Sequence, residues 1–423
     1  MSALLWLSWV YCPIMAADAQ PWQEIARRAG QVFTPTAPID QPSLFAGRQD
    51  QIRLIVDAVN QRGQHAILYG EPGVGKTSLA NVVSSFANPQ RRVLSPRVNC
   101  DDQDDFVSVW RKVFQRISET TNLHLPARVA GFKPTTDTEE VSPMVLIEDG
   151  ITPDSVRRAL TVLAQTSVPI VVIDEFDRLP ASKRRAFADM VKTLSDHGVA
   201  ATVVLVGVAE SVEQLLAEHQ SVERPLLQIR MPRMANGEIA DIVTKGLASL
   251  GMDIAPTALT RIEKLSQGLP HYAHLLCLYA SRAALDRQSM KVDAAAIDTA
   301  IQKATSGVQQ TILSAYEAAI RSARKDNLFS DVLLACALAE TSELGFFAAS
   351  DVRGPLRSVT KRNYEIPTFA QHLNEFSDAK RGMILLKTGT QRLYRYHFRN
   401  PLMQPYVIMQ GIKSKRIDVS MLD

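Results

Sequence analysis

The stretch that decides the fold is Gly70-Glu71-Pro72-Gly73-Val74-Gly75-Lys76-Thr77, which fits the pattern GxxxxGK[ST] of a phosphate-binding loop. It follows the apolar run Ala66 to Tyr69, which predicts a buried strand, and it leads into Ser78 to Val83, which predicts a helix. Such a loop requires this order of strand, turn and helix. The alternative is a glycine-rich turn that matches the pattern by chance, and the flanking segments argue against it.

Each part of this loop has a chemical role. Its glycines let backbone N–H groups close around a β-phosphate, and the helix N-terminus adds a partial positive charge. Lys76 can reach the β- and γ-phosphates, and the Thr77 hydroxyl can ligate Mg²⁺. We therefore expect ATP and Mg²⁺ as cofactors. The residues predicted to bind the nucleotide here are Gly70, Glu71, Pro72, Gly73, Val74, Gly75, Lys76, Thr77 and Ser78.

A second motif supplies the carboxylates that such a site needs. Residues 168 to 175, Val-Pro-Ile-Val-Val-Ile-Asp-Glu, predict an apolar strand whose carboxyl end carries two acids. We predict that Asp174 holds the Mg²⁺ shell and that Glu175 orients and deprotonates the attacking water. An acidic pair at a strand end can also be a solvated helix cap. Its position about 100 residues after the phosphate loop favours the catalytic interpretation.

The composition allows a large soluble protein and says little about partners. Of 423 residues, 46% are hydrophobic and 22% are charged, which suggests two to four domains. The net charge is only +3, but residues 356–423 carry 12 Lys or Arg against 5 Asp or Glu. The basic charge is thus concentrated at the C-terminal end, where a nucleic-acid contact is most plausible.

The cysteines and the first residues bear on the compartment. The four cysteines are far apart and show no CxxC spacing, so we expect isolated thiols and no disulfides. Residues 1–14 are apolar, but no Lys or Arg precedes them and they are too short to cross a bilayer. We therefore predict a cytoplasmic protein without membrane contact, with Met15 as the true first residue.

Alternating strand and helix patterns predict an α/β fold with a parallel sheet. We expect an N-terminal extension and linker over residues 1–40, a nucleotide-binding core over 41–235, a helical subdomain over 236–305 and a winged-helix-like domain over 306–423. The polar, Pro- and Gly-containing stretch 120–152 is too long for an ordinary connection, so it predicts a surface insertion.

With both motifs placed, the chain resembles the AAA+ ATPases over about residues 41–420. Within them it is similar to the replication-origin initiators and to the related bacterial ATPases of transposition and secretion. Phe45-Ala46-Gly47-Arg48 resembles the element that packs on adenine, Val98-Asn99-Cys100 the second-strand motif, and Asp174 to Asp177 the end of the acidic motif. The resemblance implies that Gly47 and Arg48 belong to the nucleotide site.

The resemblance also implies a homo-oligomer, because ATP in this family lies between neighbouring subunits. An arginine before the fifth strand reaches the γ-phosphate from the next subunit. The matching stretch here is residues 221–231, which makes Arg224 the best candidate for this trans arginine, with Arg230 and Arg233 behind it. The alternative for Arg224 is an exposed arginine at a helix end.

Two positions depart from the family pattern. The polar sensor after the fourth strand is replaced only approximately by Glu210 and Ser211, and the lid motif Gly-x-Pro-Arg is here Gly268-Leu269-Pro270-His271. A neutral imidazole at His271 cannot replace a permanently charged guanidinium at a phosphate. The departure predicts weak sensing of the nucleotide by the lid and slow turnover.

The C-terminal region has the element order of a winged helix. Helices are predicted at Leu328–Glu340, Ala348–Val359 and Ile366–Phe376, followed by a hairpin of 383–387 and 392–398. Basic residues gather on this hairpin, and they suggest contact with the backbone of double-stranded DNA: Lys380, Arg381, Lys387, Arg392, Arg395 and Arg399. The alternative is a winged helix that contacts protein, with cations that are merely solvated.

These observations favour an ATP-hydrolysing AAA+ protein that switches its assembly on DNA. The closest alternative is a regulatory NTPase that signals to an unidentified protein partner in transposition, secretion or phage defence. A third class is a nucleotide-bound scaffold that barely hydrolyses.

Overall fold

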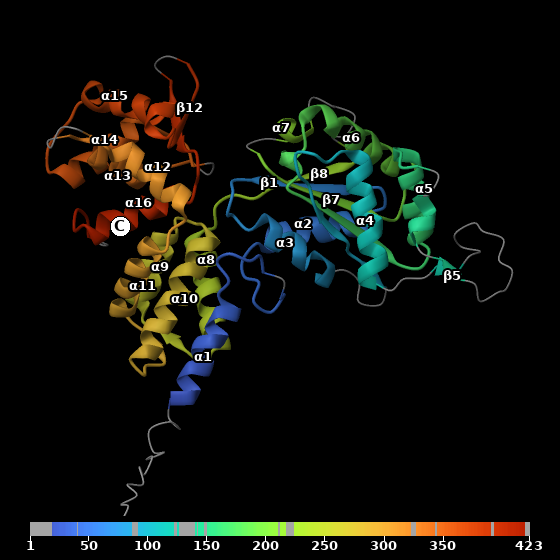
Figure 1. Ribbon diagram of the computed structural model, residues 1–423, viewed down its shortest axis with the longest axis horizontal. Helices are drawn as coiled ribbons and strands as arrows, with labels where there is room; N and C mark the ends of the chain where they lie inside the picture. Colours follow the sequence, from blue (N-terminus) through green and yellow to red (C-terminus); the bar gives the residue numbers. More distant parts are fainter. Residues whose placement is uncertain are drawn as a thin grey trace, which may run out of the picture.

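The computed structural model divides the chain into a sheet domain, a helical subdomain and a C-terminal domain (Figure 1). It describes residues 19–39, 41–86, 92–121, 125–126, 140–141, 143–147, 150–209, 212–216, 224–322, 327–342, 345–390 and 393–418. The first 18 residues, and with them the proposed start at Met15, lie outside the described part.

The sheet domain contains a parallel sheet with the strand order β2-β6-β7-β1-β8, in which β3 also pairs with β6. The strands are β1 (His65–Gly70), β2 (Val93–Leu94), β3 (Arg97–Asn99), β6 (Val168–Asp174), β7 (Thr202–Val208) and β8 (Leu226–Arg230). Strand β1 lies between β7 and β8. Because β1 and β6 both run parallel to β7, the phosphate loop after β1 and the acidic pair at the end of β6 lie at the same carboxyl edge of the sheet. The predicted α/β class with a parallel sheet is confirmed.

Helices cover both faces of this sheet. They are α2 (Gln49–Asn60), α3 (Lys76–Val82), α4 (Phe106–Thr121), α5 (Pro153–Leu163), α6 (Ala181–Asp196) and the short α7 (Glu213–Leu216). Alternate residues of β1 face opposite layers: Ala66 and Leu68 belong to one apolar cluster, and Ile67 belongs to the other. Because both faces are buried, the strands are continuous apolar runs.

The predicted insertion is described only in part. Within residues 120–152 the structure gives β4 (Leu125–Pro126) paired antiparallel with β5 (Glu140–Val141), and a 3-10 turn over Pro143–Ile147. The remainder of the stretch between these pieces lies outside the described residues.

The helical subdomain packs beside the carboxyl edge of the sheet. Its elements are α8 (Asn236–Ser249), α9 (Pro256–Ser266), α10 (Pro270–Asp286) and α11 (Ala294–Ser306), with the two-residue strands β9 (Asp253–Ile254) and β10 (Lys291–Val292). Helix α1 (Ala19–Val32) joins this bundle by packing against α10 (Figure 1). The N-terminal stretch is therefore more than the short helix and linker predicted from the sequence.

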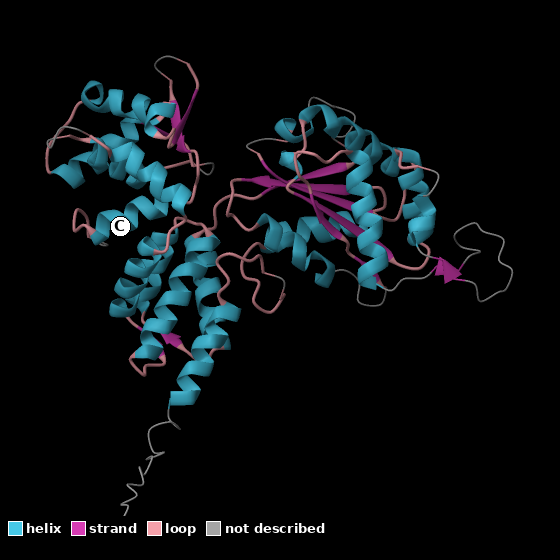
Figure 2. Ribbon diagram, viewed as in Figure 1, coloured by secondary structure: helices cyan, strands magenta, loops and turns pink. Residues whose placement is uncertain are grey.

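The C-terminal domain is mainly helical, and Figure 2 shows its few short strands apart from the large sheet. It contains α12 (Gln310–Ile320), α13 (Phe329–Leu338), α14 (Ala349–Thr360), α15 (Ile366–Phe376) and α16 (Met403–Lys413), and the strands β11 (Phe347–Ala348), β12 (Leu385–Thr388) and β13 (Arg395–Phe398). The three strands form a sheet in the order β11-β13-β12. The three predicted helices and the hairpin are present, whereas β11 and α16 were not predicted.

Among the described residues, none of the helices has both the length and the apolar character that a membrane span requires.

Candidate nucleotide-binding site

The phosphate loop connects β1 to α3 and depends on glycine at two of its turns. Gly70 has φ +151°, and a Cβ there would lie 2.4 Å from the backbone oxygen of Met231. Gly75 caps the N-terminus of α3 with φ +94°, a conformation that L side chains rarely adopt. These constraints aim the first N–H groups of α3 into the loop, where an anion binds.

Lys76 is buried at the centre of the loop. Its Nζ donates hydrogen bonds to the backbone oxygens of Gly70 at 2.9 Å and Glu71 at 2.7 Å. Burial lowers the pKa of Lys76 to about 8, although the nearby carboxylates of Asp177, Asp174 and Glu71 oppose this shift. The ammonium group is thus poorly solvated by water and well placed for a phosphate.

The two predicted Mg²⁺ ligands lie together. The Thr77 hydroxyl donates to Asp174 Oδ2 at 2.8 Å, and the other oxygen of Asp174 accepts from the backbone N–H of Glu175 at 2.8 Å. A hydroxyl and a carboxylate beside a phosphate loop are the oxygen donors that Mg²⁺ takes together with substrate phosphates, so the residues fit this ion. Arg97 on β3 also donates to Asp174 Oδ2, at 3.1 Å. No motif on the sequence had pointed to Arg97.

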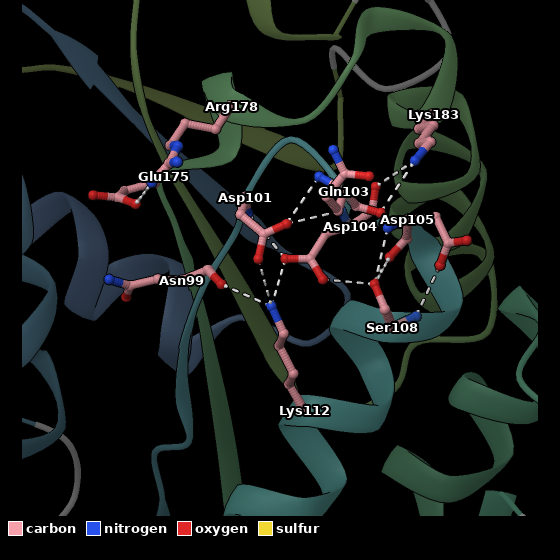
Figure 3. Close-up of polar contacts among 10 residues, drawn as sticks. All are labelled: Asn99, Asp101, Gln103, Asp104, Asp105, Ser108, Lys112, Glu175, Arg178 and Lys183. Carbon is pink, nitrogen blue, oxygen red and sulfur yellow. Dashed lines mark hydrogen bonds and ion pairs between the residues drawn. The ribbon is translucent and has the colours of Figure 1, made fainter.

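The predicted general base, Glu175, follows directly in the left-handed conformation with φ 54°. Its carboxylate is 45% exposed and pairs with Arg178 at 3.1 Å, as Figure 3 shows. The same view shows Lys112 bound to Asp104 at 2.5 Å and to Asp101 at 3.3 Å. The Lys112 contacts hold the turn between β3 and α4, and Glu175 remains open to solvent.

A cavity of about 240 Å³ adjoins the loop. Its walls come from four parts of the chain: the N-terminal strap (residues 34–39), residues 44–48, the phosphate loop with the start of α3, and side chains of the helical subdomain and the C-terminal domain. Ile39 fixes the strap, because its N–H donates to Ser78 Oγ at 3.1 Å and its carbonyl accepts from Asn81 at 3.3 Å. The linker predicted from the sequence is therefore a wall of the candidate site.

Of the two predicted adenine-side residues, Arg48 lines this cavity and Gly47 precedes it in the chain. Gly47 adopts φ +70° against Glu238, whose carboxylate accepts from the N–H of Arg48 at 2.7 Å. The buried guanidinium of Arg48 donates to the carbonyls of Val74 at 3.0 Å and Pro232 at 2.6 Å. Arg48 thereby fixes the phosphate loop to the segment after β8.

His271 lies in the cavity wall, as predicted from its place in the lid motif. Its Nδ1 lies 2.7 Å from the carbonyl oxygen of Pro35 in the strap. Burial lowers the pKa of His271, so the imidazole is neutral at pH 7. His271 therefore connects the helical subdomain to the strap and carries no positive charge towards a phosphate.

The arginines near β8 occupy different environments. Arg224 is exposed at the amino end of β8, on the edge of the sheet opposite its own phosphate loop. Arg233 instead forms an ion pair of 2.9 Å with Glu71 of its own loop, and its side chain is 13% exposed. Glu210 and Ser211, the approximate sensors, lie outside the described residues.

The basic residues of the hairpin also differ in their roles. Lys380, Arg395 and Arg399 are exposed, and Arg392 lies outside the described residues. Arg381 is held by Glu375 at 2.8 Å and lies 3.4 Å over the ring of Phe329. Lys387 donates to Asn374 and lies over the Tyr394 ring. Two of the six cations predicted to contact DNA, Arg381 and Lys387, therefore also make contacts within the domain.

A phosphate loop after an inner strand of a parallel sheet, with an Asp-Glu pair at the end of the next strand but one, is the arrangement of a P-loop nucleotide-binding domain. The family model of the AAA ATPase domain matches residues 44–206. This part of the chain is thus similar to the AAA ATPase domain.

Individual known proteins resemble the chain over lengths that differ from that of the family model. A Walker-type ATPase from Pyrococcus abyssi is 15% identical, with 89% of this chain and 99% of that chain covered at a TM-score of 0.52, which shows a shared fold. The ORC2 protein of Aeropyrum pernix is 13% identical, with 91% and 98% covered at a TM-score of 0.48. The Holliday junction branch migration complex subunit RuvB of Acidothermus cellulolyticus is 46% identical over 57 residues, which span 12% of this chain and only 16% of that protein.

Proposed function

We propose that this chain binds ATP with Mg²⁺, hydrolyses it, and uses the nucleotide to switch its assembly on double-stranded DNA. The observation that carries the catalytic part is the hydrogen bond from Thr77 to Asp174, beside the buried Lys76 and directly before Glu175. These four side chains, from α3 and the end of β6, supply the groups that phosphoryl transfer to water needs.

Each residue has a defined task in this proposal. Thr77 and Asp174 hold Mg²⁺, which neutralises charge on the phosphates when bound. Lys76 binds the β- and γ-phosphates, and Glu175 takes a proton from the attacking water. Arg224 acts on the site of a neighbouring subunit, so the proposal includes a homo-oligomer with nucleotide at its interfaces. We place this activity in the cytoplasm, where ATP is available.

The DNA part rests on the C-terminal domain. Its order of helices and strands, α13-β11-α14-α15-β12-β13, is that of a winged helix, and exposed cations lie at Lys380, Arg395 and Arg399. Further exposed cations, Arg357, Lys361 and Arg362, lie at and just beyond the end of α14. Together they can neutralise several phosphates of a duplex.

One experiment separates DNA binding from its alternative. Fluorescence anisotropy of a labelled duplex with the ATP-bound Glu175→Gln protein should give an affinity that falls steeply with added salt, because each neutralised phosphate releases a counterion. Affinity that is undetectable at low salt, or that does not change with salt, would contradict DNA binding.

A second candidate is a regulatory NTPase that signals to a protein partner. The observation that favours it is the composition of α15, the helix in the position of a recognition helix, which contains no Lys or Arg. Its exposed side chains, Pro367, Thr368, Gln371 and Asn374, offer a neutral surface. Turnover that DNA does not change would support this candidate.

A further inference from the structure

The C-terminal domain forms part of the wall of the nucleotide cavity. Leu402, just before α16, lines the cavity, and a Cβ on Gly73 of the phosphate loop would lie 3.3 Å from its side chain. The backbone oxygen of Leu402 accepts a hydrogen bond of 2.6 Å from Tyr272 of α10. The domain is therefore in contact with both the loop and the helical subdomain at this point.

A second contact places the backbone of the C-terminal domain against the loop. Gly345, two residues before β11, has φ +75°, and a Cβ there would lie 2.5 Å from a carboxylate oxygen of Glu71. It would also lie 3.1 Å from the guanidinium of Arg233. Only a glycine lets the chain approach this ion pair so closely without displacing it.

The third contact is a bridge of polar side chains through Arg233. Its Nε donates to Glu71 at 2.9 Å and its Nη1 donates to Gln404 of α16 at 2.6 Å. Gln404 is 1% exposed, and its Nε2 donates to Gln267 of the helical subdomain at 3.2 Å and to the carbonyl of Ala337 at 2.9 Å. One buried amide thus connects the phosphate loop, the helical subdomain and α13.

A movement of one side chain in this bridge forces the others to move, because they are buried and each supplies a hydrogen-bond partner for the next. Leaving a buried donor or acceptor without a partner costs more than the hydrogen bond itself gains. The backbone carbonyl of Glu71 also accepts a hydrogen bond of 2.7 Å from Lys76. A shift of Glu71 therefore changes the surroundings of the Lys76 ammonium group. If nucleotide and the docked domain favour the same arrangement of the loop, each strengthens binding of the other by the same factor, since coupling between two sites is reciprocal.

We propose that Gln404 is a positioning residue that couples docking of the C-terminal domain to retention of the nucleotide. The docked domain holds the loop and the cavity wall in place through Arg233, and release of the nucleotide requires this contact to loosen. The inference rests on the proposed nucleotide binding and is independent of DNA binding.

The test measures dissociation of mant-ADP, a fluorescent ADP, from the full chain during a chase with unlabelled ADP. Gln404→Met keeps the side-chain volume but removes the hydrogen bonds, so release should be about threefold to tenfold faster. The matched control is Gln410→Met on the same helix, because the side chain of Gln410 donates to Tyr406 one turn away, at 2.7 Å, within α16 itself. Release from the control should match the wild type.

A second variant and a second readout keep the test decisive. Gly345→Ala changes a loop rather than a helix, and its Cβ should displace Glu71 and also speed release. In the wild type, ADP should slow hydrogen exchange in α16, and Gln404→Met should abolish this effect. Circular dichroism first establishes that both variants are folded. If both then release mant-ADP at the wild-type rate, the coupling is overturned and the ATPase proposal remains intact. A wild-type protein that binds no mant-ADP would overturn both.

Discussion

Two regions of the molecule contribute to the same candidate site in different ways. The phosphate-binding side, residues 70–78 with Asp174 and Glu175, is a local sequence pattern on two strands of the sheet. The opposite side consists of the strap, His271 of α10 and Leu402 of the C-terminal domain, which are hundreds of residues apart in the chain. The comparison indicates that the chemistry of the site is encoded locally, whereas its enclosure depends on tertiary packing.

The largest effect is expected from a variant that removes the proposed general base and leaves the cavity walls unchanged. Glu175→Gln should lower kcat about 1000-fold, because the general base is lost, while mant-ADP affinity stays within about twofold. Glu119→Gln, on α4 with a similarly exposed side chain, is the control and should leave turnover unchanged. Turnover of Glu175→Gln equal to that of the wild type would show that another group deprotonates water.

The next effect asks whether a neighbouring subunit completes the chemical side. Arg224→Ala should lower turnover about 100-fold or more, as the loss of a trans arginine does. Mixing this variant with Glu175→Gln should restore part of the activity, because some interfaces then carry both Glu175 and Arg224. Arg53→Ala, an exposed arginine of α2, controls for loss of surface charge. No recovery on mixing would contradict the trans role.

Acid should destabilise the elements that carry both regions, because β1, which leads into the phosphate loop, and α10 each contain one buried histidine. Burial lowers the pKa of His65 in β1 and of His274 in α10 to about 4, below the ordinary value of 6.5. Between these values the unfolded chain binds more protons, so stability falls as pH falls. Each histidine should remove about 2 kcal/mol of unfolding free energy between pH 7 and pH 5.

Denaturant unfolding, followed by circular dichroism at pH 7, 6 and 5, measures this decrease in unfolding free energy. The N–H of Val203 donates to His65 Nδ1 at 3.1 Å, and the side-chain oxygen of Asn in His65→Asn can accept this hydrogen bond. This variant should lose about half of the decrease in unfolding free energy between pH 7 and pH 5. An unchanged pH dependence in this variant would mean that His65 protonates without cost.

The smallest effect separates the cations of the C-terminal domain into two kinds. Arg381→Met should cost about 2 kcal/mol of stability, because it removes the hydrogen bonds that Arg381 donates to the carbonyl of Ala319 and to Oε2 of Glu375. Arg399→Met, an exposed position, should change stability by less than about 0.5 kcal/mol and should weaken DNA binding with a shallower salt dependence. Thermal unfolding and anisotropy titrations give the two readouts. Equal stability losses would remove the distinction.

The order of strand, loop and helix around the phosphate loop was predictable from the sequence to within two residues, because the three segments are contiguous and the glycines of the loop leave few conformations. The sequence also predicted the type and nearly the bounds of α13, α14 and α15 from their apolar periodicity. It could not predict that the strap lines the cavity or that Arg233 pairs with Glu71. These contacts join residues 162 or more positions apart, or rest on backbone hydrogen bonds that leave no side-chain pattern.

Arg97 illustrates the same limit at the chemical side itself. It contacts Asp174 because β3 pairs with β6 in register, with Asn99 opposite Asp174. An arginine on a short strand gives no signal of this kind in one sequence. Sheet register had to be known first.

The most direct test of the account is steady-state ATP turnover of the wild-type chain with Mg²⁺, with and without double-stranded DNA at fixed moderate salt, with Glu175→Gln as the blank. The account predicts turnover well above the blank and stimulation by DNA. Turnover above the blank that DNA does not change would contradict the DNA-switch proposal, and turnover no higher than the blank would contradict the proposed ATPase.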